Sequence, residues 1–295
     1  MLRTNEARLV KMAVQGKPAN PLRFSEFEMD ADGRGHSLPS VGGITYNVKV
    51  GDPAFGWRGD HIEPGVSVIL DEEKRSSRQN MALQFLACIG NEARVIAGAA
   101  KGAKGTVVGH HGGVEHLIID FDDKALEKLT YDDKVLVRAH GQGLRLEALP
   151  DIAIYNVDPK LLGLWDLKIL SGGILEVPVA LEVPSALMGS GIGHADPGTG
   201  DYDITTQDPK AVRKYGLDRL RFGDFVAILD ADNTFGRHYY EGALTIGVVT
   251  HSDSFLSGHG PGVCTLLSSK KGNIRPRISK SANLAQVLKI GRFKK

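Results

Sequence analysis

Residues 92–121 read EARVIAGAAKGAKGTVVGHHGGVEHLIIDF, and this stretch decides the fold of the N-terminal half. Three short apolar runs, at 94–97, 106–108 and 117–121, are separated by glycine-rich turns. Short apolar runs between glycine turns are typical of consecutive antiparallel strands. The stretch therefore predicts a small β-meander.

The composition places the whole chain among folded globular proteins. Its 295 residues are 42% hydrophobic and 24% charged, which suits a sizeable core and excludes a disordered chain. The 36 glycines argue against a protein dominated by long helices. A net charge of +1 argues against nucleic acid or an anionic membrane as the main partner.

The positions of the cysteines and the lengths of the apolar stretches bear on the cellular compartment. The two cysteines, Cys88 and Cys264, are far apart and fit neither a disulfide framework nor a zinc knuckle. No stretch approaches the ~18 consecutive apolar residues of a membrane span. We therefore expect a cytoplasmic protein with no membrane partner and no nucleotide cofactor.

Local patterns predict a mainly β protein of the α+β class. Alternating side chains favour a strand at 43–50, and continuous apolar runs favour buried strands at 225–229 and 243–250. Helices are expected after Ser77, with Ser76 or Ser77 as the cap, and after Asp208, which can cap the second helix. We divide the chain into domains at 1–150 and 151–295, with the candidate site in the second.

Residues 91–123 also resemble a KOW motif, the strand-turn-strand unit of small SH3-like barrels, in the arrangement of Val95, Gly98, Gly102, Gly105 and Val107. The resemblance implies an SH3-like barrel in the N-terminal half. In that family the unit often binds RNA, but acidic side chains outnumber basic ones here. Binding to nucleic acid therefore remains the less favoured alternative.

Polar side chains gather where two predicted strands of the C-terminal half end. The strand at 225–229 leads into two aspartates, and the strand at 243–250 leads into a His-Ser-Asp sequence and a later histidine. Carboxylates and imidazoles together suit Zn, Mn or Fe. The predicted metal ligands are Asp230, Asp232, His251, Asp253 and His259. The alternatives are that these residues only build turns or form a buried hydrogen-bond network.

A glycine-rich run precedes a further carboxylate pair, Asp201 and Asp203. Its backbone N–H groups are candidates for binding an anion or an oxyanion, although a flexible loop explains the run equally well. Arg237 is a candidate for binding a substrate carboxylate, or else a structural partner of the nearby aspartates. The glycines expected to bind the anion are Gly189, Gly191 and Gly193.

The N-terminal half contains one further catalytic candidate. Asp60 and His61, beside Glu63, have the residue types of a general base with its orienting carboxylate. An inert histidine in a Gly/Pro loop is the plainer alternative. The pair at 110–111 is expected on a solvated turn. No triad-hydrolase, P-loop or zincin motif occurs.

Several strings along the chain resemble the prokaryotic family known as domain of unknown function 4438, from about residue 4 to 290. This resemblance implies no particular activity. The strings include Gly42-Gly-Ile-Thr-Tyr-Asn-Val, Gly51-Asp-Pro-Ala-Phe-Gly-Trp, Ala87-Cys-Ile-Gly-Asn-Glu-Ala, Gly200-Asp-Tyr-Asp-Ile and Gly258-His-Gly-Pro-Gly.

A shorter likeness points to small-amide hydrolases. The strand Gly172-Gly-Ile-Leu-Glu-Val-Pro-Val, followed by a turn rich in Gly, His and Asp, resembles the acetamidase/formamidase family. It departs from that family at His194-Ala-Asp-Pro-Gly, where the family turn is His-Ala-x-Gln-Gly-Asp.

We therefore expect a metal-assisted hydrolase of a small polar substrate such as an amide, with one divalent Zn, Mn or Fe ion. The alternative is a non-catalytic, oligomeric binding protein in which the same residues build turns. In both cases we expect a small-molecule ligand and a homo-oligomer.

Overall fold

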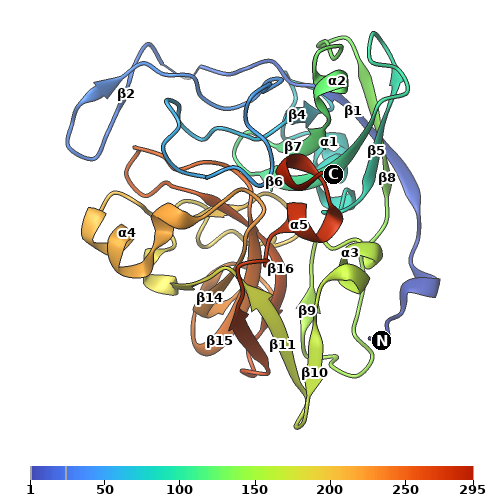
Figure 1. The fold of residues 1–295 in the computed structure, drawn as a ribbon, viewed down its shortest axis with the longest axis vertical. Coiled ribbons are helices and arrows are strands. Elements are labelled where there is room, and N and C mark those ends of the chain that lie inside the picture. Colours follow the sequence, from blue (N-terminus) through green and yellow to red (C-terminus); the bar gives the residue numbers. More distant parts are fainter. Residues whose placement is uncertain (1, 24, 295) are drawn as a thin grey trace.

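The computed structural model describes residues 2–23 and 25–294, and its N-terminal half contains a closed β-barrel (Figure 1). The strands are joined in the order β1-β4-β7-β6-β5-β8, and β8 pairs with β1 to close the ring. The expected meander supplies three neighbouring strands, and the remaining three come from outside 91–123. The barrel strands are β1 (Met12–Pro18), β4 (Val66–Ile69), β5 (Glu92–Ala97), β6 (Lys104–His111), β7 (His116–Phe121) and β8 (Lys134–Ala139).

The C-terminal half is built on a second sheet with the order β12-β14-β15-β16-β13, and β9 pairs with β16. A smaller sheet, β10-β11-β17, lies beside it in the lower part of Figure 1. The main sheet consists of β9 (Ala153–Ile154), β12 (Leu181–Pro184), β13 (Tyr202–Asp203), β14 (Phe225–Asp232), β15 (His238–Val249) and β16 (Gly262–Ser269). The smaller one consists of β10 (Lys168–Leu170), β11 (Ile174–Val179) and β17 (Ile274–Ile278).

The helices are short, as the glycine content predicts. Ser77 and Asp208 accept hydrogen bonds from the first turns of α1 and α4, which confirms both predicted helix starts. None of the helices in the described residues is long and apolar enough to cross a membrane. The helices are α1 (Arg78–Leu86), α2 (Asp123–Leu126), α3 (Pro159–Leu164), α4 (Pro209–Tyr215) and α5 (Leu284–Leu288).

Short elements and irregular segments complete the fold. A two-stranded ribbon pairs β2 (Glu28–Met29) with β3 (Gly35–His36). The strand predicted at 43–50 is wrong, because only Ile44 forms a bridge, to Val66. On that edge of β4, β1 pairs with Val68 and Ile69, so only the Val66 end is left for this segment. Four 3₁₀ turns span Glu6–Arg8, Ser185–Leu187, Leu217–Arg219 and Gly291–Phe293.

The barrel and the main sheet meet at the end of β6. The Cα of Gly109 lies against Thr250, so that a Cβ atom at 109 would overlap the threonine side chain. The backbone N–H of His110 donates to Sγ of Cys264 at 3.2 Å. This contact brings the last residues of β6 close to the loop after β15, where histidines of the two halves come together.

Candidate functional site

Three histidines from distant parts of the chain converge between the barrel and the main sheet. His61 lies in the loop before β4, His111 ends β6, and His251 follows β15. All three side chains are buried. The rings of His111 and His251 stack with centroids 4.1 Å apart, and those of His61 and His251 are 4.9 Å apart.

Each of the three rings is oriented through its Nδ1 atom by a hydrogen-bond acceptor. Asp60 binds Nδ1 of His61, Glu63 Oε1 lies 2.5 Å from Nδ1 of His111, and the Ser252 carbonyl lies 3.0 Å from Nδ1 of His251. An acceptor at Nδ1 places the proton there and leaves Nε2 with a free lone pair. One coordinating atom from each ring lies within 4.8 Å of the other two.

Two carboxylates face the same cluster from β13. Asp201 and Asp203 are separated by one residue, so their side chains point to the same side of the strand. Nε2 of His251 lies 2.9 Å from Asp201 Oδ2 and 3.5 Å from Asp203 Oδ1. The 2.9 Å contact lacks hydrogen-bond alignment, and the buried Nε2 atom has no hydrogen-bond partner among the described residues.

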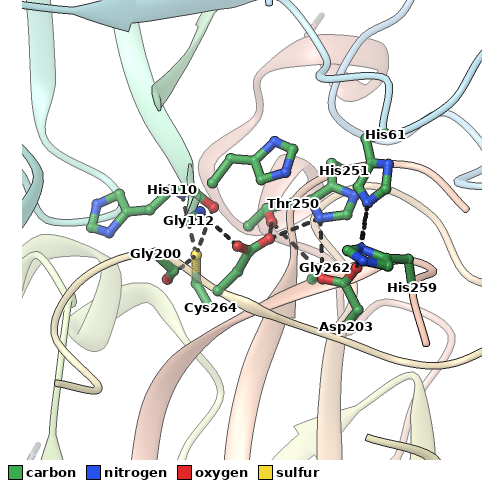
Figure 2. A network of polar contacts seen from close by, with 12 residues as sticks. His61, His110, Gly112, Gly200, Asp203, Thr250, His251, His259, Gly262 and Cys264 are labelled. Carbon is green, nitrogen blue, oxygen red and sulfur yellow. Dashed lines mark hydrogen bonds and ion pairs between the residues drawn. The ribbon is translucent and has the colours of Figure 1, made fainter. Parts of the chain in front are cut away.

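His259 completes the cluster on its more exposed side, where its ring meets His61 and Asp203 (Figure 2). Its Nδ1 atom is 3.0 Å from Nε2 of His61 and 3.1 Å from Oδ2 of Asp203. A cavity of about 500 Å³ opens beside these residues. Apart from the cluster, it is lined by Val41, Met81, Val114, Leu256, Glu28 and Glu115, among others.

The charges of the cluster are strongly coupled. Burial opposes the charge on His251, but Asp201 and Asp203 raise its pKa well above the usual value. Burial also opposes ionisation of Asp203, yet His251, His259 and His61 hold its pKa well below the usual value. The site therefore stabilises negative carboxylates that face positive charge.

The backbone is shaped to bring these groups together. His61 has a φ of 51°, a left-handed conformation that is uncommon outside glycine and is found preferentially at functional sites. Gly262 lies so close to Asp201 and His251 that a Cβ atom there would overlap both side chains.

Two predicted ligands, Asp230 and Asp232, lie outside this cluster. β14 and β15 are antiparallel, so Asp232 pairs with His238 at the start of β15, whereas His251 follows the far end of that strand. Along β14, which pairs with β15 from Phe225 opposite Val248 to Asp232 opposite His238, seven residue steps of about 3.4 Å each separate the two ends of the pairing. Asp230 also sits at a bulge with a φ of 54°, so the expected common orientation of the two carboxylates is lost. The aspartate that the sheet brings to His251 is not at 230 or 232.

Asp232 and Asp253 have other contacts. Oδ2 of Asp232 lies 3.2 Å from Nζ of Lys270. Asp253 is near Asp60, and burial together with that charge raises the pKa of Asp253 to about 6. The Asp253 carbonyl accepts from the backbone N–H of His61, and its carboxylate belongs to no ligand group in the described part of the chain.

Arg237 lines the cavity, but its guanidinium is held by hydrogen bonds to the backbone. Its Nη1 and Nη2 atoms donate to the carbonyls of Asp201 and Thr199 at 2.5 and 2.7 Å, and its guanidinium lies over the Tyr202 ring. Arg237 therefore pairs with neither Asp230 nor Asp232, the structural partners considered from sequence. Arg237 braces β13 and so positions the two aspartates of the cluster.

The glycine-rich run does not present the expected row of free N–H groups. Gly189 donates to the Asp203 carbonyl at 2.8 Å, and Gly193 donates to the Arg237 carbonyl at 2.7 Å. Gly191 lines the cavity. The close approach of Gly189 to the Gly258 carbonyl leaves no room for a Cβ atom. The run therefore packs β13 against the loop before β16.

Sequence reasoning missed His111 and underrated two aspartates. His111 was expected on a solvated turn, but it is buried at the end of β6. The signal available was a histidine pair that directly follows an apolar run and precedes two glycines. Asp201 and Asp203 were treated as secondary, although their one-residue spacing is that of two ligands on one strand face.

The comparisons agree on a family. The model described as "Domain of unknown function (DUF4438), N-terminal" matches residues 27–163, and its C-terminal counterpart matches residues 165–288. This chain belongs to the DUF4438 family. A solved structure described as "Crystal structure of TM1086" is 42% identical to this DUF4438 chain, covers 96% of it and 98% of its own length, and superposes with a TM-score of 0.90. No curated protein matches this DUF4438 sequence.

Proposed function

We propose that this DUF4438 protein is a metal-dependent hydrolase of a small polar substrate such as an amide. One observation carries the proposal. Three buried imidazoles have their Nδ1 atoms fixed by acceptors, while one coordinating atom from each lies within 4.8 Å of the other two. Metal-binding histidines usually have an acceptor of this kind on the second nitrogen.

The donor set indicates the class of ion. Imidazole nitrogens together with carboxylate oxygens suit Zn, Mn or Fe, whereas Ca and Mg sites are built mainly from oxygen. Such an ion lowers the pKa of a bound water to about 7 and polarises a substrate carbonyl. The Nε2 atom of His61 faces the cluster, so we assign His61 as a ligand oriented by Asp60, in place of the general base considered from sequence.

The cavity supports a small substrate. A volume of about 500 Å³ is at the lower end for small-molecule sites, and the cluster forms one of its walls. His259 is the cluster residue with the most exposed side chain, at 33%. It therefore lies where a substrate in the cavity would meet the cluster.

Metal content and hydrolysis together test the proposal. The protein, without an affinity tag, is incubated with Zn, Mn or Fe(II), desalted and analysed for bound metal. We expect His251→Ala to hold at most about half of the wild-type content, because it removes a donor at the centre of the cluster. His238→Ala is the matched control, since His238 lies at the other end of β15. Wild-type protein that retains no metal would overturn the site.

Hydrolysis is measured on the same preparations with a panel of small amides and esters. Metal-loaded wild type should hydrolyse at least one of them, and His251→Ala should not. A fully loaded wild type that leaves the whole panel intact would overturn the hydrolase assignment while leaving the metal site in place.

A further inference from the structure

The donor atoms of the cluster form three groups of three residues, and two of these groups contain Asp203. Asp203 groups with Asp201 and His251, and it also groups with His61 and His259. Within each group the donor atoms lie within 4.8 Å of one another. Two overlapping groups exceed what a single four-coordinate ion uses.

The carboxylate of Asp203 faces both groups, with a different oxygen toward each. Oδ1 lies 3.5 Å from Nε2 of His251, and Oδ2 lies 3.1 Å from Nδ1 of His259 and 3.5 Å from Nε2 of His61. Figure 2 shows Asp203 beside His259, with His251 and His61 on the same side of the aspartate. This is the placement of a carboxylate that bridges two ions.

The separations between donors match those of ligands on a common ion. Two atoms that each lie about 2.1 Å from one ion are about 3.0 Å apart at a right angle and about 3.4 Å apart at the tetrahedral angle. The first group shows 2.9 and 3.5 Å, and the second shows 3.0, 3.1 and 3.5 Å.

The buried Nε2 atom of His251, which has no hydrogen-bond partner among the described residues, is a second indication of a bound cation. With its Nδ1 proton donated to the Ser252 carbonyl, a neutral His251 directs a lone pair at Asp201 Oδ2, 2.9 Å away. Two lone pairs at this distance repel, so either a proton on Nε2 or a metal ion lies between them. The contact lacks hydrogen-bond alignment, which favours the metal ion. The facing nitrogens of His61 and His259 are 3.0 Å apart, where they either share a proton in a hydrogen bond or bind a common ion.

The buried charge is consistent with two divalent ions. Asp60, Glu63, Asp201 and Asp203 are all at most 6% exposed, and none forms an ion pair with a lysine or arginine in the described part of the chain. Buried carboxylates need a compensating charge. Two divalent cations would supply four positive charges to these four carboxylates.

We propose that the cluster is a two-metal centre in which Asp203 bridges the ions. The first ion is bound by His251, Asp201 and His111. The second is bound by His61 and His259. The inference rests on the proposed function and extends it, because a pair of ions about 3.5–4 Å apart can hold the attacking water and the substrate oxygen together.

Metal stoichiometry tests the second ion. The wild type, saturated with Mn or Zn and desalted, should hold about two ions per chain, as two-metal sites do. His259→Ala should hold about one, and His238→Ala, the matched control, should hold two. A wild type that saturates at one ion overturns the two-metal centre but leaves the proposed function standing, whereas a wild type without metal overturns both.

Two aspartate variants test the bridge, with folding of each verified by its melting temperature. Asp203→Asn should weaken the binding of both ions, and Asp201→Asn should weaken the binding of the first ion only. Equal losses in the two variants would overturn the bridging role.

The Mn-loaded wild type provides a spectroscopic readout. We expect an electron paramagnetic resonance spectrum of two exchange-coupled ions, and His259→Ala should give the spectrum of an isolated ion. An uncoupled spectrum from wild type holding two ions would show that they are not bridged.

Discussion

Gly262 lies directly against the imidazole of His251. A Cβ atom at position 262 would overlap the Nε2 and Cδ2 atoms of the ring, as well as a carboxylate oxygen of Asp201. Gly262, the first residue of β16, thus packs directly against the cluster. Only glycine at this position leaves room for the side chains of His251 and Asp201.

Gly262→Ala should therefore displace the cluster. We expect metal affinity to fall by more than about tenfold, and the tight packing adds a loss of about 1–3 kcal/mol in unfolding free energy. Competition with a chromogenic chelator measures the affinity, and urea unfolding measures the stability. Gly163→Ala in α3, where a Cβ atom meets no neighbour, is the control. Unchanged affinity in Gly262→Ala would contradict this arrangement.

Glu63→Gln should weaken metal binding without removing a ligand. Glu63 binds Nδ1 of both His111 and His116. Burial opposes its ionisation, but the charge of His116 and the hydrogen bonds from both rings hold the pKa of Glu63 well below the usual value. Loss of its charge should lower metal affinity by about 10–100-fold. Ser67→Ala is the control, because the Ser67 hydroxyl contacts the same carboxylate but none of the cluster histidines. Wild-type affinity in Glu63→Gln would refute the orienting role.

Asp120→Asn should stabilise the protein at neutral pH. Burial raises the pKa of Asp120 to about 6 from 3.8, and its Oδ1 atom has no partner among the described residues. Between pH about 4 and 6 the folded state therefore binds more protons, so wild-type stability falls as the pH rises. The variant should gain at most about 3 kcal/mol above pH 6.

The gain should vanish below pH about 4, where the carboxyl is protonated in both states. Urea unfolding at pH 4 and pH 8 checks this pattern, and Asp32→Asn, at an exposed site, is the control. A variant less stable than wild type at pH 8 would contradict the prediction.

Arg237→Lys should destabilise the fold by about 2–4 kcal/mol, because lysine cannot hold two buried carbonyls and lie flat over Tyr202. Thermal unfolding measures the loss, and Arg213→Lys on the exposed side of α4 is the control. A variant with wild-type stability that loses only substrate turnover would instead indicate a substrate-binding role.

Local sequence patterns predicted the elements that depend on neighbours along the chain. The β-rich class, the strands around 106–121, 225–229 and 243–250, and the capped starts of α1 and α4 follow from periodicity and capping residues. The strand expected at 43–50 did not form because strand formation needs a free edge on a neighbouring strand, and β1 leaves only the Val66 end of β4 open. The pattern of a segment does not contain that information.

The candidate site shows the same division. The sequence alone determined which residue types were available, and it singled out His61, His251 and His259 from their surroundings. Only the tertiary structure decided which carboxylates they meet. Antiparallel pairing of β14 and β15 moves Asp232 to the far end of the sheet, while β13, which pairs with β16, brings Asp203 beside His251. Strand direction and order are set by long-range pairing, because the free energy of a sheet depends on contacts between residues far apart in the chain.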